Sequence, residues 1–152
     1  MGDGMSVTRI IFTLLLAVAL WVIASHLARA DVRILSSQGG QVGPFLDLFE
    51  QINKSGERVI IDGPCLSACT LLLGIVPRNH ICVTHQAVLG FHAASYYDDA
   101  SRSLVPTREG TRLVMQVYPP AIRSWIVRHG GLRPALIELR GRELAEMYPV
   151  CH

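Results

Sequence analysis

The feature that most constrains the fold is an apolar strand that breaks sharply and is followed at once by a second apolar run. Val59-Ile60-Ile61 is continuous and β-branched, which is typical of a strand buried on both faces of a parallel sheet. Asp62-Gly63-Pro64 breaks this strand, and Leu66 to Gly74 then predicts a buried helix. A turn of this kind lies at the carboxyl end of the sheet, where α/β sheets bind their ligands.

Short strand-like runs alternate with helical patterns through the first part of the domain. Val32 to Leu35 predicts a strand, and apolar residues spaced along one helix face follow from Val42 to Ile52. Ile81-Cys82-Val83 and Val88 to Phe91 predict two further strands. The order β-α-β-α-β-β, followed by helices, predicts an α/β fold with a short, mainly parallel sheet and flanking helices.

The remainder of the chain is expected to be one loop followed by helices. Ala93 to Pro106 predicts a surface loop, and the pattern is helical from Thr107 onward. Pro119-Pro120 and Gly130-Gly131 divide the helical part. A last amphipathic helix is predicted to run to about Met147 through Leu136, Leu139 and Leu144.

The N-terminus has the organisation of a secretory signal peptide. Arg9 precedes an apolar stretch, Ile10 to Ser25, and Ala28-Arg29-Ala30 has the small-residue pattern of a cleavage site. The apolar stretch is shorter than the ~20 residues that span a bilayer, which favours cleavage over an uncleaved anchor. We therefore expect residues 1–30 to be removed and residues 31–152 to form one exported, periplasmic domain. The alternative is a domain held at the membrane by residues 10–25 and facing the periplasm.

All four cysteines, Cys65, Cys69, Cys82 and Cys151, lie in the exported part. Export to an oxidising compartment makes disulfides their expected state. The predicted chain path would let Cys69 face Cys82 and leave Cys65 for Cys151, although four cysteines allow three pairings and the sequence does not choose. Three residues separate Cys65 from Cys69, which disfavours both a zinc knuckle and a C-x-x-C redox pair. No metal or cofactor is expected.

Charge excludes one class of partner. The chain has 14 basic and 12 acidic residues, a net charge of +2, and no basic run of the kind that binds nucleic acid. We therefore expect no nucleic-acid partner, and contact with a membrane only through residues 10–25 if they are not cleaved.

Ser67 lies in the turn before the predicted buried helix and has two interpretations. It is a helix N-cap, because serine oxygen accepts hydrogen bonds from the first turn, or it is a nucleophile. A nucleophile needs a base, and His92 ends a predicted strand at the same edge. His92 has its own alternative, a partly buried histidine bonded to a loop carbonyl. Gly39-Gly40 offer backbone N–H groups for an oxyanion, or else form only a tight turn.

In motif order the chain resembles the ClpP/crotonase superfamily, in particular the Clp protease proteolytic subunit and its small exported bacterial relatives. The resemblance is carried by ILSSQGG, VIIDGPCLSACTLLLG, RNHICV and VLGFH, although the serine stands in LSAC where the protease has A-S-M-G. It implies a ClpP/crotonase-like fold. It also implies the following site: Ser67 as nucleophile, His92 as base, and N–H groups of Gly39 or Gly40 and of Ala68 as the oxyanion hole.

The third member of the triad follows less directly from the resemblance. The family's acid aligns with Leu136, and the nearest acidic residue is Glu138. Asp98 and Asp99, in the loop after the predicted base, are the other candidates. The Ser–Lys arrangement of signal-peptide peptidases does not fit, because the only lysine, Lys54, lies at the end of a predicted helix.

Together these features predict an exported, peptidase-like serine hydrolase that acts on peptides or proteins without a cofactor. The alternative is a noncatalytic periplasmic binding or scaffold protein on the same fold. The acyl-CoA chemistry of crotonases is disfavoured, since an exported protein has no access to cytosolic CoA. The sequence leaves the substrate open, and it leaves assembly into a homo-oligomer open as well.

Overall fold

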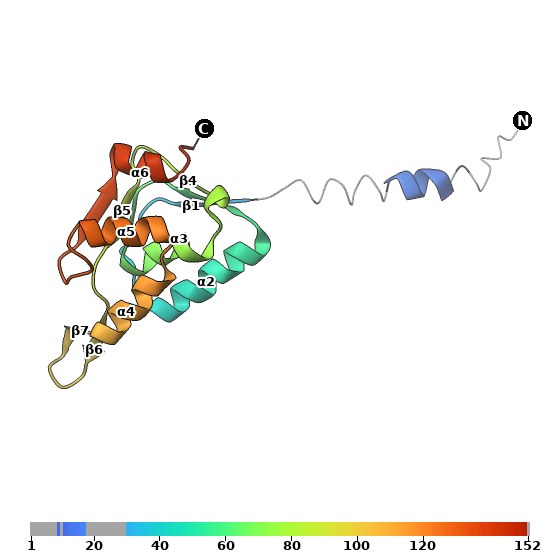
Figure 1. Cartoon of the computed structure of the whole chain (residues 1–152). Helices are drawn as coiled ribbons and strands as arrows, with labels where there is room; N and C mark the ends of the chain where they lie inside the picture. The colour runs from blue at the N-terminus through green and yellow to red at the C-terminus, as the bar shows by residue number, and fades with distance from the viewer. Residues whose placement is uncertain (1–8, 10, 18–29, 152) are drawn as a thin grey trace, which may run out of the picture. The chain divides into compact units, whose positions relative to one another are not determined.

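The computed structural model describes residues 9, 11–17 and 30–151 (Figure 1). The chain divides into two compact parts between Ala30 and Asp31. In the first part, residues 9 and 11–17 are helical. Most of the predicted signal peptide, including the pattern at residues 28–29, lies outside the described residues. No helix within the described ranges is both long enough and apolar enough to cross a membrane.

The second part contains strands and helices in alternation, as predicted for its first half. Its elements are β1 (Asp31–Ile34), α2 (Val42–Ser55), β2 (Arg58–Ile61), β3 (Pro64–Leu66), the 3₁₀ helix η1 (Ser67–Leu71), α3 (Leu72–Ile75), the 3₁₀ helix η2 (Arg78–His80), β4 (Ile81–Val83), β5 (Val88–Phe91), β6 (Ser95–Asp98), β7 (Ser103–Pro106), α4 (Arg108–Val117), α5 (Pro120–Arg128), β8 (Ile137–Arg140) and α6 (Gly141–Met147).

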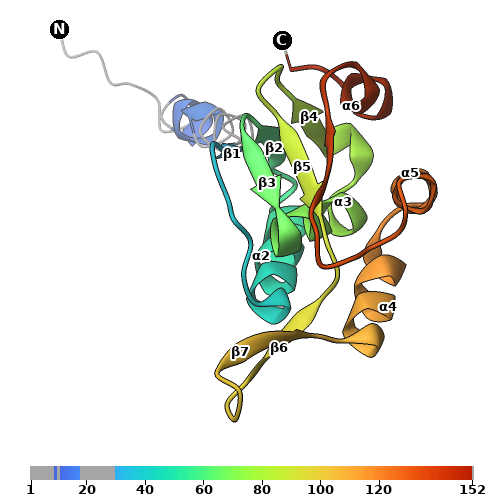
Figure 2. The same ribbon diagram turned by 90° about the vertical axis from the view of Figure 1, so that its left-hand side faces the viewer.

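The strands of residues 31–151 form three small sheets. Strands β1, β2 and β4 pair in that order and are all parallel. In the second sheet β3 is parallel to β5, and β8 is antiparallel to β5 on its other side. Strands β6 and β7 form an antiparallel hairpin that projects away from both sheets (Figure 2). The mixed α/β class is confirmed, and the predicted parallel sheet is confirmed in part.

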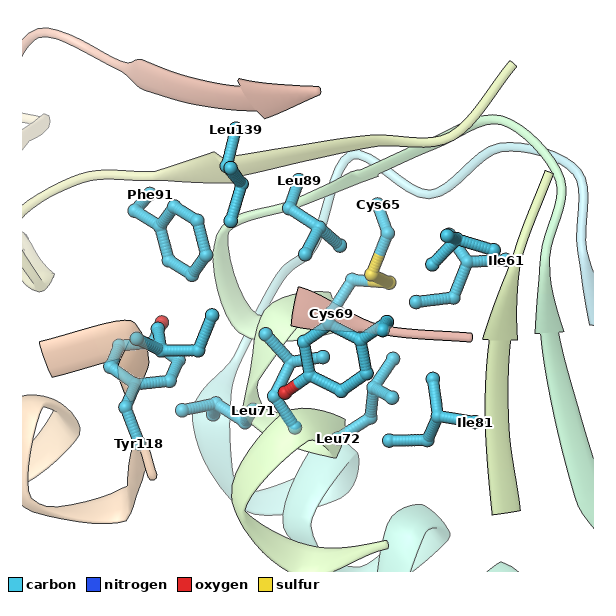
Figure 3. Packing of buried hydrophobic residues seen from close by; sticks show 14 of the residues in the cluster. Ile61, Cys65, Cys69, Leu71, Leu72, Ile81, Leu89, Phe91, Tyr118 and Leu139 are labelled. Carbon is cyan, nitrogen blue, oxygen red and sulfur yellow. A yellow bond between two sulfur atoms is a disulfide. The ribbon is translucent and has the colours of Figure 1, made fainter. Parts of the chain in front are cut away.

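The hydrophobic core lies between the two larger sheets and the helices. Figure 3 shows Leu89, Phe91 and Leu139 of the second sheet facing Leu71 and Leu72 of the buried helical run. Strand β2, predicted to be buried, is buried along its apolar residues, and α2 packs against η1 and α3. Burial of this kind, at roughly 25 cal/mol per Å² of apolar surface, is the main source of stability for the domain.

The start of the buried helix differs from the prediction. Pro64–Leu66 is the strand β3, paired with β5, and the helical run begins one residue later, at Ser67. It opens as a 3₁₀ helix and becomes an α-helix only at Leu72. A three-residue strand carries too little sequence pattern to be separated from the turn that precedes it.

Two further predictions are wrong. The expected surface loop from Ala93 to Pro106 contains the hairpin β6–β7, whose side chains are largely exposed and therefore lack the alternation that marks a half-buried strand. The expected helix from residue 136 to residue 147 begins with the strand β8. There Ile137 and Leu139 are buried while Glu138 and Arg140 are exposed, so pairing with β5 overrides the helical spacing of the leucines.

Candidate active site

Ser67 has a backbone conformation that is uncommon for a residue with a side chain. Its φ is 56°, in the left-handed region, and Arg102 is the only other non-glycine residue with positive φ in the described part of the chain. This conformation costs about 1–2 kcal/mol. Such strain persists only where the surroundings enforce it, and it is concentrated at functional sites.

Ser67 opens the helix, but it is not the helix cap. Leu66 occupies the N-cap position, and Ser67 is the first residue of η1. The predicted N-cap role is therefore wrong. Its hydroxyl makes no hydrogen bond to any other described residue. An N-cap role would not have accounted for the left-handed geometry in any case, because N-cap residues typically have extended backbone.

The loop after β1 is bonded directly to the strand that leads into Ser67. The Ser37 N–H donates to the Pro64 carbonyl at 2.7 Å, and the Leu66 N–H donates to the Ser37 carbonyl at 2.9 Å. These bonds place Gly39 against the turn. A Cβ added to Gly39 would lie 2.6 Å from Ser67 Cβ and 2.9 Å from the Ala68 nitrogen. Only glycine allows this approach.

The two glycines differ in the use of their N–H groups. The Gly39 N–H donates to Ser37 Oγ at 3.3 Å. The Gly40 N–H has no partner among the described residues. Of the two predicted donors, Gly40 is the one whose N–H is free to bind an oxyanion, together with Ala68 in the first turn of η1, where helix N–H groups lack partners.

His92 follows directly on the end of β5 and is half-buried. Its Nδ1 lies 2.7 Å from the carbonyl oxygen of Ala93. A carbonyl can only accept a hydrogen bond, so Nδ1 is the donor and carries the proton. In the neutral ring Nε2 is then the unprotonated nitrogen, as a general base requires. The loop-carbonyl bond that was one interpretation of this histidine is therefore present, and it leaves Nε2 available.

Ser67 and His92 line one cleft of about 680 Å³. Gly39 and Gly40 lie on the same cleft, and no aspartate, glutamate, lysine or arginine lines it. The opposite wall is the β6–β7 hairpin, which contributes Ser95, Tyr96, Tyr97 and Leu104. A smaller cavity of about 30 Å³ joins Ser67, Ala68 and His92 on the inner side. Four of the predicted residues thus reach one place from three separate segments.

A second large cavity does not contain these groups. It measures about 370 Å³, lies between β1 and α2, and is lined mainly by apolar side chains. It includes neither Ser67 nor His92. Ser67 and His92 therefore meet on the cleft beside the hairpin and on the small cavity next to it.

The candidate acids lie elsewhere. Glu138 faces Gly90 across the β5–β8 pair, its side chain is 42% exposed, and it lies 3.7 Å from Arg140. Asp98 accepts a hydrogen bond from the Ser101 N–H in the hairpin turn, and the bonds from Ser101 hold the pKa of Asp98 below its usual value. Asp99 is exposed in the same turn. None of the three lines either cavity at Ser67.

The cysteines flanking Ser67 are bonded to each other. Cys65 and Cys69 form a disulfide with Cα atoms 5.3 Å apart, and both residues are buried (Figure 3). The predicted disulfide state is confirmed, but the suggested facing of Cys69 and Cys82 is wrong. The left-handed turn at Ser67 brings the helix back onto the end of β3. The sulfur of Cys69 therefore meets that of Cys65, four residues earlier in the sequence.

The second disulfide joins Cys82 to Cys151, so the suggested partner of Cys151 is also wrong. The C-terminal segment runs parallel to β4. The Val83 N–H donates to the Pro149 carbonyl at 2.9 Å, and the Cys151 N–H donates to the Val83 carbonyl at 3.0 Å. No cysteine is free. No three His, Cys, Asp or Glu side chains gather as metal ligands within the described ranges.

Two residues near the site were not predicted. Thr70 Oγ1 donates to the Ser67 carbonyl at 2.6 Å and lies 2.7 Å from the hydroxyl of Tyr118. Tyr118 also borders the small cavity with His92. The one local signal was a hydroxyl residue inside an apolar helical run. The contact with Tyr118 spans 48 positions and has no local signal.

Comparison with known proteins gives a distant likeness only. The sequence matches no family model, and no curated protein matches it. A peptidase from Plasmodium falciparum is similar in structure, with a TM-score of 0.49, 8% identity, and coverage of 88% of this chain and 83% of that one. A point mutant of ClpP1 from Listeria monocytogenes has a TM-score of 0.45 and 14% identity, covering 86% and 77%. Similarity at this level assigns no function, so the case for one rests on the geometry of the cleft.

Proposed function

We propose that this protein is an exported serine hydrolase of the peptidase type, with a ClpP/crotonase-like fold. The observation that carries the proposal is the strained turn at Ser67, which opens on the same cleft as His92. Strained backbone of this kind is concentrated at active sites and ligand clamps, which supports a functional role for Ser67. The two disulfides support an oxidising, extracytoplasmic location.

The proposed reaction begins with attack of Ser67 Oγ on a carbonyl carbon of the substrate. His92 Nε2 accepts the hydroxyl proton as the C–O bond forms, and the carbonyl becomes an oxyanion. The N–H groups of Gly40 and Ala68 bind that oxyanion. The oxyanion then re-forms the carbonyl, the bond to the leaving amine or alcohol breaks, and the imidazolium gives its proton to that leaving group, which leaves an acyl enzyme on Ser67 Oγ. Water, activated by the same imidazole, hydrolyses the acyl enzyme and regenerates the serine.

In this mechanism the Ala93 carbonyl orients His92. It fixes the required tautomer by accepting from Nδ1–H. A neutral carbonyl stabilises the imidazolium less than a carboxylate would, so the proposed unit is a Ser–His dyad with modest turnover. Glu138, the acid suggested by the resemblance, together with Asp98 and Asp99, is a competing proposal for the orienting group.

The substrates we propose are peptides or proteins, bound in the uncharged cleft between residues 38–42 and the hairpin. The apolar and aromatic side chains of the hairpin supply contact area for an extended chain. Assembly into a homo-oligomer is compatible with this arrangement.

The test is labelling of the mature protein with a fluorophosphonate probe, which reacts only with an activated serine. Peptide mass spectrometry should find the adduct on Ser67. Ser67→Ala and His92→Ala should abolish labelling, whereas Ser95→Ala, which removes another serine from the same cleft, should not. A well-folded wild-type protein that does not label would overturn the hydrolase proposal and favour the noncatalytic binding protein.

A further inference from the structure

A chain of buried hydroxyl groups reaches the backbone of Ser67 from the helical side of the molecule. Thr70 is fully buried, and it is the only polar residue in the buried class among the described residues. Its Oγ1 contacts both the Ser67 carbonyl and the hydroxyl of Tyr118, at 2.6 and 2.7 Å. Tyr118 lies between α4 and α5 and is 2% exposed. Both contacts are therefore shielded from water.

The direction of this chain follows from counting protons. The Thr70 hydroxyl has one proton, and the Ser67 carbonyl can only accept, so that proton points to Ser67. The Tyr118 hydroxyl must then donate to Thr70. Burial raises the pKa of Tyr118 to about 12, which keeps this donor protonated at neutral pH. The relay runs from Tyr118 to Thr70 to the Ser67 carbonyl.

The Ser67 carbonyl shares a rigid peptide plane with the Ala68 N–H. In a trans peptide the two groups point in opposite directions, so fixing the carbonyl oxygen also fixes the direction of the N–H. That N–H is one of the two proposed oxyanion donors. A hydroxyl that holds the Ser67 carbonyl therefore acts on the nucleophile's backbone and on the oxyanion hole together.

We propose that Thr70 and Tyr118 are positioning residues that hold the left-handed turn at Ser67 and aim the Ala68 N–H at the oxyanion. This inference rests on the proposed function. A threonine that bonds a carbonyl three residues back is ordinary in helices. The second bond is not, because it comes from a different element and ties the turn to the α4–α5 junction.

The experiment compares Thr70→Val, which keeps the shape and removes the hydroxyl, with Thr70→Ser, which restores it, and with Tyr118→Phe. Tyr148→Phe is the matched control, because Tyr148 is equally buried but borders a different cavity, beside α3 and α6. Two properties are measured on folded protein: hydrogen exchange of the segment 66–72 by mass spectrometry, and the fluorophosphonate reaction resolved into a limiting rate and a probe affinity.

For Thr70→Val and Tyr118→Phe we expect exchange of the segment to be at least about 10-fold faster, and the limiting rate to fall about 10- to 100-fold with unchanged probe affinity. Thr70→Ser should restore both, and Tyr148→Phe should change neither. Unchanged exchange, or an unchanged limiting rate in well-folded Thr70→Val, would overturn the proposal. If the wild-type protein does not label, the proposed hydrolase function fails, and the exchange data alone decide whether the relay holds the turn.

Discussion

Gly39 lies so close to Ser67 that a methyl group on it would come within 2.6 Å of Ser67 Cβ. The same methyl group would also come within 2.6 Å of the Leu66 carbonyl oxygen. The loop after β1 therefore forms the wall against which the strained turn is held. The nucleophile position and the proposed oxyanion loop are a single packed unit, and a change in one must displace the other.

Gly39→Ala should therefore inactivate the protein more than it destabilises it. The added methyl group displaces the turn, and a shift of about 1 Å at a reacting group costs about 100-fold in rate. The control is Gly131→Ala, because Gly131 has a similar φ of 75° but nothing within 4 Å of the added Cβ. It should lose about 1 kcal/mol of unfolding free energy from backbone strain and keep its labelling rate. Equal labelling of the two variants, measured with the fluorophosphonate probe, would contradict the packing argument.

The disulfides should separate stability from activity. On the chain-entropy relation, the Cys82–Cys151 bridge, with its sequence separation of 69, contributes about 4 kcal/mol, and the Cys65–Cys69 bridge, with a separation of 4, about 2 kcal/mol. Urea unfolding of the two double alanine variants should show that order. The labelling rate should fall more in Cys65→Ala/Cys69→Ala than in Cys82→Ala/Cys151→Ala, because only the Cys65–Cys69 bridge encloses Ser67. A Cys65→Ala/Cys69→Ala protein that labels at the wild-type rate would show that this bridge does not constrain the serine.

The elements that could be predicted from the sequence are those with strong local signals. The continuous apolar strand ending at Ile61 and the amphipathic helix from Val42 are formed by burial, which leaves a periodic pattern. The exposed hairpin β6–β7 buries little apolar surface, so its sequence shows no periodic pattern. Leu136 and Leu139 are three apart, a spacing that fits a helix, and only pairing with β5 makes residues 137–140 the strand β8.

The features of the site likewise divide into those that the sequence predicts and those that it does not. Placement of Ser67 and His92 on one edge follows from the rule that strand ends meet at the same side of a parallel sheet, because they come directly after the parallel strands β3 and β5. The two glycines follow a strand of the other sheet, and the bridge between Ser37 and Cys65 brings their loop to this edge. The Thr70–Tyr118 contact and the pairing of Cys82 with Cys151 depend on how distant segments fold back. No local sequence pattern predicts these two contacts. The hydrogen bond from His92 Nδ1 to the Ala93 carbonyl is not predictable either, because it depends on the conformation of the loop.

The orienting group of His92 can be tested by removing the candidate acids one at a time. Because Nδ1 is bonded to a backbone carbonyl, Glu138→Gln should change the labelling rate by less than about 3-fold, as expected for a residue paired with Arg140 at the surface. Asp98→Asn and Asp99→Asn should behave alike. Rates are compared with that of His92→Ala. An acid variant that approaches the loss of His92→Ala would identify a triad member and replace the dyad proposal.

Export predicts a defined N-terminus for the mature protein. If the segment ending in Ala28-Arg29-Ala30 is a cleaved signal, protein recovered from the periplasm after expression of the full chain should begin at Asp31. N-terminal sequencing gives the answer directly. A full-length species that sediments with the membrane would instead support the anchored alternative.

Alkaline pH should unfold the domain through its buried tyrosines. Burial raises the pKa of Tyr118 to about 12, well above its ordinary value, and the same holds for Tyr148. A pKa raised by folding stabilises the protein fully below the unfolded pKa, and that contribution is lost as pH rises through the folded pKa. For Tyr118 the loss is about 3 kcal/mol between roughly pH 10 and 12.

Urea unfolding measured across this range, with tyrosinate absorbance followed in parallel, should show stability falling steeply. In Tyr118→Phe the free energy of unfolding should fall less with rising pH, by about the contribution of one tyrosine, because phenylalanine has no proton to lose. Its stability at neutral pH should also be lower, by about 1 kcal/mol or more, because Thr70 loses its donor. Tyr148→Phe should show the shallower fall without the defect in labelling. An alkaline fall of wild-type steepness in Tyr118→Phe would mean that this hydroxyl reaches water in the folded protein, which contradicts its assignment as a buried donor to Thr70.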